Sequence, residues 1–156
     1  MPATLGSEFL MSVDADVAAP MPVGQTPFGT RMIADIKGGT FEGPRLKGDI
    51  LPSGGDWLLV RGDGSFQIDV RAALKTHDGA MIYMQYLGRW HFPPEVGAKL
   101  FDPEQAASVS PDDYYFRTTP YFETGDERYA WLNGIVAVGV GATKPGGVRY
   151  EVHAIT

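Results

Sequence analysis

Apolar and polar residues alternate with a period of two along most of this chain, which is typical of β-strands that bury one face. In 66–71, for example, Phe66, Ile68 and Val70 alternate with polar residues. A short apolar run at 57–61 predicts a strand buried on both faces. The strands predicted in this way cover 5–13, 30–41, 45–50, 57–61, 66–71, 80–86, 114–118, 121–123, 135–142 and 148–155.

Glycine-containing turns separate several of these segments. Asp63-Gly64 and Asp78-Gly79 predict tight hairpins, because glycine accepts the positive φ that such turns require. The alternation stops between 88 and 113, where 95–100, after a proline pair, predicts one short helix and 103–107 a further turn. Segment 127–132 fits a helical turn or a strand equally well.

These elements predict an all-β fold, namely a single antiparallel β-barrel or strongly curved sandwich of about eight to ten strands with one or two short helical turns. The chain has 156 residues, which suits one domain spanning 1–156. A barrel with eight or more strands can enclose one small ligand.

Composition and charge exclude several classes of function. The net charge of −6 and the lack of any Lys/Arg run argue against nucleic acid and an anionic membrane surface as partners. Without cysteine, the chain forms no disulfide and has no thiolate nucleophile. The first nine residues lack the features of a secretory signal, and no apolar run is long enough to span a bilayer. We therefore expect a cytoplasmic location.

Chemistry-bearing residues are concentrated in a few glycine-rich segments. Segment 38–57 combines glycines and prolines with acids, an arginine and a tryptophan, and similar groupings recur at 114–117, 122–125 and 131–133. In these segments nearly the whole chain resembles the DUF3237 (UPF0311) family of small bacterial and fungal proteins. The resemblance implies a β-barrel-like domain, and it implies no activity, because the function of the family is unassigned.

Four carboxylates and one phenol are candidates for acid–base catalysis, which needs a positioned proton acceptor and donor. Each also has a structural interpretation: a salt bridge with a neighbouring arginine, a hydrogen bond to turn amides, a helix cap, or ordinary strand packing. The candidate catalytic residues are Glu42, Asp56, Asp69, Tyr83 and Glu123.

Aromatic, arginine and amide side chains are candidates for substrate binding, because rings can stack on a planar ligand and a guanidinium can bind an anionic oxygen. The same residues would also suit a core, a cation–π pair, a turn or an oligomer interface. The candidate substrate-binding residues are Trp57, Arg71, Arg117, Phe122, Trp131 and Asn133.

The three histidines, His77, His91 and His153, have no metal-ligand spacing, and no nucleotide-binding motif is present. We therefore expect neither a metal nor another cofactor; the pattern excludes a histidine-based metal site and leaves a carboxylate-rich one open. The sequence leaves three hypotheses open. The first is a cofactor-free enzyme of the hydratase, lyase, isomerase or hydroalkoxylation type that acts on a small aromatic or polyketide-like molecule by general acid–base chemistry in a barrel cavity. The second is a carrier of a small aromatic or otherwise apolar ligand, and the third is a structural module. A homo-oligomer is expected.

Overall fold

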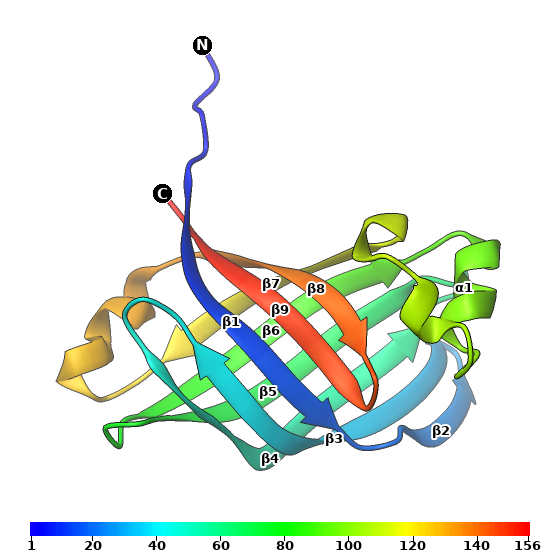
Figure 1. Cartoon of the computed structure of the whole chain (residues 1–156), viewed down its shortest axis with the longest axis horizontal. Coiled ribbons are helices and arrows are strands. Elements are labelled where there is room, and N and C mark those ends of the chain that lie inside the picture. Colours follow the sequence, from blue (N-terminus) through cyan, green and yellow to red (C-terminus); the bar gives the residue numbers. More distant parts are fainter.

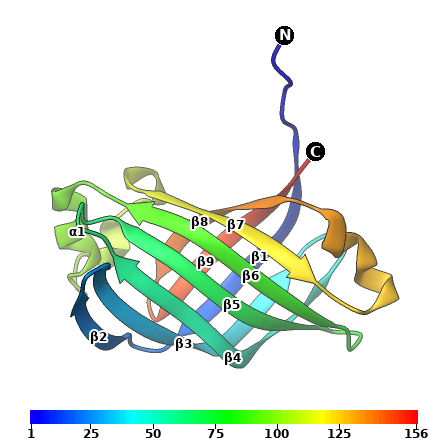
Figure 2. The ribbon, with the colours of Figure 1, turned by 180° about the vertical axis from the view of Figure 1, so that it is seen from behind.

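Eight strands of one antiparallel sheet close into a barrel in the structure, a computed structural model that describes residues 1–156. The strands follow the order β1-β9-β8-β7-β6-β5-β4-β3-β2, and a pairing between β1 and β3 closes the ring and leaves β2 outside it (Figures 1 and 2). Their bounds are β1 Ser7–Val17, β2 Met21–Thr26, β3 Gly29–Glu42, β4 Lys47–Val60, β5 Phe66–Thr76, β6 Met81–His91, β7 Tyr115–Glu123, β8 Ala137–Lys144 and β9 Gly147–Ile155. The predicted fold class is confirmed.

Short helices lie at the two ends of the barrel. Helix α1 (Pro94–Leu100) and the 3-10 turns η1 (Ala106–Ser108) and η2 (Pro111–Asp113) lie at one end, and η3 (Glu127–Gly134) lies at the other (Figure 1). None of these helices has the length and apolar character that crossing a membrane requires.

Glycines in the dense segment allow the barrel to close. Gly39 pairs with Ala15 of β1 and has a φ of 138°, and a Cβ at this position would lie 2.1 Å from the carbonyl oxygen of Asp14. Gly54 similarly approaches the carbonyl oxygen of Arg71, where the β4–β5 register shifts. Bulges of this kind increase strand curvature, so these glycines let β3 and β4 bend.

Alternate residues of each strand fill the interior, as the sequence pattern predicts. On β5, Phe66, Ile68 and Val70 are buried, and the intervening residues face outward. The interior cluster extends to η3, whose Leu132 side chain is fully buried, as is that of Leu74 on β5. The opposite end of the barrel is less completely filled and holds the site described below.

Three elements differ from the prediction. β4 is one continuous strand of 14 residues in place of two short ones, and β7 likewise continues through Pro120. Pro120 is tolerated because β8 pairs with β7 only at Arg117 and Thr118, so no β8 partner needs its missing N–H. β2 was not predicted, because Met21–Thr26 contains a proline and a glycine and buries no residue fully.

Candidate functional site

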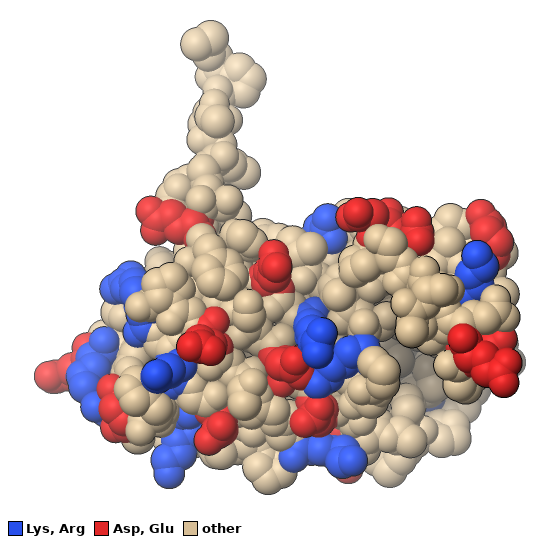
Figure 3. All heavy atoms as spheres, in the orientation of Figure 1, with Lys and Arg blue, Asp and Glu red and all other residues tan.

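A cavity of about 420 Å³ opens into the barrel interior between the β1–β2 connection and the β8–β9 turn. Figure 3 shows the surface hollowed between the β8–β9 end of the sheet and the side where α1 lies. The lining is mostly apolar. It comprises Val17, Ala18, Ala19, Pro20, Ala34, Asp56, Leu58, Ile68, Trp90, Phe116, Thr143, Gly146, Gly147, Val148 and Tyr150.

Asp56 is the only carboxylate in this lining. In the sheet it lies directly between Ala34 of β3 and Val70 of β5, both buried, so its side chain belongs to the inward-facing row. The β4–β5 ladder has no paired residues between Asp56↔Val70 and Leu59↔Gln67. Within this gap the backbone N–H of Asp69 donates to Asp56 Oδ1 at 3.1 Å. The carboxylate thus takes over the role of a backbone acceptor and is held in place.

Burial among apolar side chains raises the pKa of Asp56 to about 7. Removal of water from the carboxylate is the largest cause, and the hydrogen bond from Asp69 and the charge of Arg31 oppose it. The negative charge of Asp69 raises the pKa further. Near neutral pH, Asp56 is therefore present in both its neutral and its ionised form, which is the condition a general acid–base group needs.

Two buried tyrosines lie close to Asp56. Tyr86 faces Val70 from β6, and its ring meets the ring of Tyr150 edge-on with the centroids 5.3 Å apart. Burial raises the pKa of both hydroxyls, and the negative charge of Asp56 raises the pKa of both further. Both tyrosines therefore remain neutral hydrogen-bond donors and acceptors at physiological pH.

Trp90 contributes an unpartnered donor to the same region. Its indole lines the cavity, and its buried Nε1–H has no hydrogen-bond acceptor in the protein. The ring packs against Phe66 and Phe116, with centroids 4.7 and 5.5 Å apart, so its position is well fixed. A buried donor without a partner costs free energy, which a ligand oxygen or a water molecule would recover.

Of the residues predicted from sequence, the structure brings only Asp56 into the cavity. Asp69, Arg71 and Trp57 lie on the outer face of β4 and β5. Arg71 forms a 3.8 Å ion pair with Asp69, and its guanidinium lies 5.4 Å from the centroid of the Trp57 ring. Asp69 thus reaches the cavity site only through its backbone N–H.

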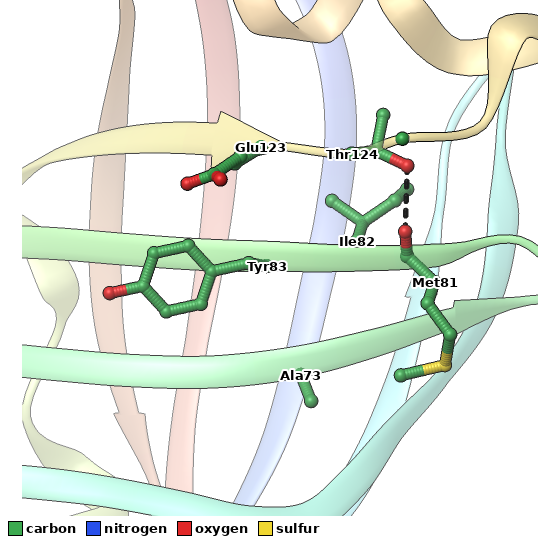
Figure 4. A pocket seen from close by; sticks show the side chains of 7 residues that line it. Ala73, Met81, Ile82, Tyr83, Glu123 and Thr124 are labelled. Atoms are coloured by element: carbon green, nitrogen blue, oxygen red, sulfur yellow. Dashed lines mark hydrogen bonds between the residues drawn. The ribbon is translucent and has the colours of Figure 1, made fainter.

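Tyr83 and Glu123 are brought together, but also on the outer face. They pair directly between β6 and β7 and border a shallow hollow of about 300 Å³ (Figure 4). The Tyr83 hydroxyl donates to Gln85 Oε1 at 2.9 Å. In the same hollow, the Thr124 hydroxyl donates to the carbonyl oxygen of Met81.

Arg117 lies at the other end of the same face. It pairs with Arg89 of β6, and the two arginines border a hollow of about 550 Å³. The guanidinium lies 5.2 Å from the centroid of the Tyr115 ring. The outer face of β6 and β7 therefore has a basic end and an acidic end.

The other candidates lie near η3. Phe122 is part of the buried core, and Glu42 is exposed at the end of β3. Trp131 stacks under the guanidinium of Arg45, 3.6 Å from the ring centroid. Asn133 holds the chain after β7 by accepting from the N–H of Thr124 and donating to its carbonyl oxygen. Trp131 and Asn133 therefore have structural roles and lie away from the cavity.

Sequence reasoning missed Tyr86, Trp90 and Tyr150. A signal was present, because the alternation places Tyr86 and Tyr150 on the buried faces of their strands, where a hydroxyl group needs a polar partner. No group of three or more His, Asp or Glu side chains comes together in a way that could hold a metal ion.

The fold and site thus define a small closed β-barrel protein with one partly buried carboxylate in an apolar interior. The family model described as "Protein of unknown function (DUF3237)" matches residues 5–155, and the chain belongs to this family. It is 32% identical to a UPF0311 protein of Rhodopseudomonas palustris over 99% of both chains.

Solved structures show the same barrel. A crystal structure of a conserved protein of unknown function from R. palustris has a TM-score of 0.91 at 31% identity, with 99% of this chain and 100% of that chain covered. A β-barrel-like protein from Acinetobacter baumannii has a TM-score of 0.85 at 38% identity, with 100% and 99% covered.

One relative is named for an enzymatic activity. The chain is 27% identical to a hydroalkoxylation enzyme of Penicillium herquei, over 85% of this chain and 71% of that protein. A solved structure of an enzyme from the same fungus has a TM-score of 0.75 at 20% identity and covers 100% of this chain and 98% of its own, a likeness of fold alone.

Proposed function

We propose that this protein is a cofactor-independent enzyme that uses Asp56 to move a proton on a small, mostly apolar molecule bound inside the barrel. The observation that carries the proposal is the position of Asp56, a single carboxylate with a pKa of about 7 in an apolar cavity of about 420 Å³. A carboxyl group with a pKa near the working pH both gives and takes protons effectively.

The reaction that this site supports best is the addition of a hydroxyl group across a carbon–carbon double bond within one molecule. Neutral Asp56 donates its proton to one alkene carbon, and the hydroxyl oxygen of the substrate bonds to the neighbouring carbon. That oxygen then loses its proton to the Asp56 carboxylate, which restores the neutral acid. The step consumes no co-reactant, and the distant relationship to a hydroalkoxylation enzyme favours it over other acid–base reactions.

The groups around Asp56 would orient the substrate. The hydroxyl of Tyr150, which lines the cavity and packs against Tyr86, can stabilise charge that develops on a substrate oxygen, and the free Nε1–H of Trp90 can donate to a carbonyl or ether oxygen. The apolar walls of Leu58, Ile68 and others would hold the hydrocarbon part and exclude water.

Deuterium incorporation tests this proposal directly. The protein would be incubated in D2O with a panel of phenols that bear an alkenyl side chain, and products would be separated by chromatography and weighed by mass spectrometry. Cyclisation through Asp56 leaves one non-exchangeable deuterium on carbon, a mass increase that spontaneous exchange of the hydroxyl does not produce. Asp49→Asn, an exposed aspartate on the same strand, is the matched control for Asp56→Asn.

The apolar cavity would also suit a ligand carrier, and the same experiment separates the two functions. A carrier would bind panel members with one-to-one stoichiometry, measured by quenching of tryptophan fluorescence, without forming product. The enzyme proposal is overturned if panel members bind and the wild type forms no deuterated product, or if Asp56→Asn forms as much product as the wild type.

A further inference from the structure

The outer face of β6 and β7 is unusually rich in exposed large side chains. Tyr83 is 39% exposed, Leu87 50% and Tyr121 57%, and Tyr115 next to them is 47% exposed. Aromatic residues and arginine are enriched at protein–protein interfaces relative to the rest of the surface. This face is on the outside of the barrel and does not contribute to the cavity that holds Asp56.

Charge is separated along this face. Arg89 and Arg117 lie directly opposite each other at one end, and neither forms an ion pair within the chain. Each donates only to the carbonyl oxygen of the residue before it. Like charges directly opposite each other destabilise a sheet, so a counter-charge from elsewhere would stabilise the pair. At the other end, Tyr83 and Glu123 lie opposite each other, and Glu123 has no ion-pair partner either.

The two ends are related by a simple symmetry. Tyr86 pairs with Pro120, and this central pair lies three residues from Tyr83 and from Arg89 on β6. On β7 it lies three residues from Arg117 and from Glu123. At about 3.4 Å per residue, Arg89 and Arg117 lie about 10 Å from the Tyr86–Pro120 pair on one side, and Glu123 lies about 10 Å from it on the other.

From this arrangement we propose that a second copy of this chain docks on the β6–β7 face, with a twofold axis that runs across the strands at the level of the Tyr86–Pro120 pair. Such an axis reverses the strand direction and places β6 over β6 and β7 over β7. Arg117 of each copy then lies over Glu123 of the other. An isologous interface makes every contact twice, so one residue pair gives two ion pairs.

The remaining contacts fit the same symmetry. Arg89 of each copy lies over the other copy's Tyr83, whose ring suits a guanidinium. Between the charged ends, Leu87 of each copy lies over Gln85 of the other. Tyr121 of each copy lies over Thr119 of the other. This exposed central strip would be buried, and burial strengthens the ion pairs at its two ends.

Charge reversal tests the proposal without altering the barrel interior. The wild type is expected to sediment at twice the 16.9 kDa mass of the chain. Arg117→Glu and Glu123→Arg should each weaken dimerisation at least about tenfold, because each places two like-charged pairs in the contact. The double variant carrying both changes restores opposite charges and should dimerise again. Lys37→Glu on β3 and Glu104→Arg, at exposed positions away from this face, are controls and should leave the mass unchanged.

Mixing the two single variants gives a sharper result. On β7, the Arg117→Glu chain carries a glutamate at both ends of the contact and the Glu123→Arg chain carries an arginine at both ends. A heterodimer of the two should therefore form with two opposite-charge pairs, although neither variant dimerises alone. The proposal is overturned if the wild type is monomeric at high protein concentration, if the single variants keep the wild-type mass, or if neither the double variant nor the mixture recovers the dimer. Circular dichroism of each variant checks that the barrel is folded.

Discussion

Asp56 and Tyr86 lie on either side of Val70, each directly opposite it in the sheet, so all three side chains belong to one inward-facing row. Neighbouring strands are about 4.8 Å apart, and the two polar side chains therefore enter the barrel about 10 Å from each other. Tyr150 packs against Tyr86 from the far wall. Asp56 and Tyr150 both line the cavity, so a substrate bound there could contact the carboxyl group and a phenol at the same time.

Asp56→Asn should abolish product formation, with a loss of at least about a hundredfold, because the amide cannot exchange a proton at neutral pH. The variant should still fold, since the amide oxygen can accept from the N–H of Asp69 as the carboxylate does. Turnover with a panel substrate and a ligand-binding measurement check this prediction. If the variant loses ligand binding as well as turnover, the effect of the substitution is structural and not catalytic.

The stability of the wild type should decrease as the pH rises from about 4 to about 7. The pKa of Asp56 is about 7 in the folded protein and its ordinary value is 3.8, so in this interval the folded state binds more protons than the unfolded state. Ionising Asp56 above pH 7 therefore costs the folded state on the order of 4 kcal/mol. Urea unfolding of wild type and Asp56→Asn checks this: the variant should be the more stable at pH 8, and the difference should shrink towards pH 4.

Tyr150→Phe should lower turnover by about ten- to a hundredfold, because it removes a cavity hydroxyl that can stabilise a developing charge. Tyr86→Phe should lower turnover less, because Tyr86 packs against Tyr150 and does not line the cavity. Both side chains are buried and the change removes one oxygen atom, so the barrel should remain folded. Steady-state kinetics check this prediction. Tyr83→Phe removes a hydroxyl from the outer face and serves as the control; an equal loss in that variant would contradict the assignment.

Gly39→Ala should destabilise the barrel by about 3 kcal/mol or more. The residue has a φ of 138°, and a Cβ would lie 2.1 Å from the carbonyl oxygen of Asp14, so the β1–β3 pairing must shift. Urea unfolding measures the change. Gly62→Ala is the control, because a Cβ there meets nothing within 4 Å. Equal stability of the two variants would show that the closure tolerates a side chain at residue 39.

The period-two alternation predicts the barrel well because each strand separates a filled interior from the outside. It predicts the inward-facing residues of β5 and β6 almost without error, including Tyr86. It fails at β2, whose residues remain largely exposed and therefore carry no alternation. The continuity of β4 and β7 was also missed, since glycine and proline interrupt the pattern where the strand itself continues.

The site was harder to predict, because a motif rich in chemical groups does not show which face of the sheet it occupies. Asp56 and Trp57 are adjacent in the sequence and project to opposite sides of the wall. Asp69, Tyr83, Arg117 and Glu123 carry suitable groups and lie outside the cavity. Several conspicuous residues proved to hold the scaffold: Gly39 and Gly54 bend the strands, and Arg45 stacks on Trp131. The catalytic and binding roles that the sequence suggests for Asp69, Tyr83, Arg117 and Glu123 remain predictions.

The pairing of β1 with β9 also bears on how the molecule acquires its shape. Ser7 lies opposite Ile155, and the N–H of Gly6 donates to the carbonyl oxygen of Thr156. A chain that emerges from the ribosome in sequence order must therefore complete β9 before the ring can form. Contacts between segments so distant in sequence slow folding to milliseconds or seconds, and until then the half-built wall exposes unpaired strand edges to other nascent chains.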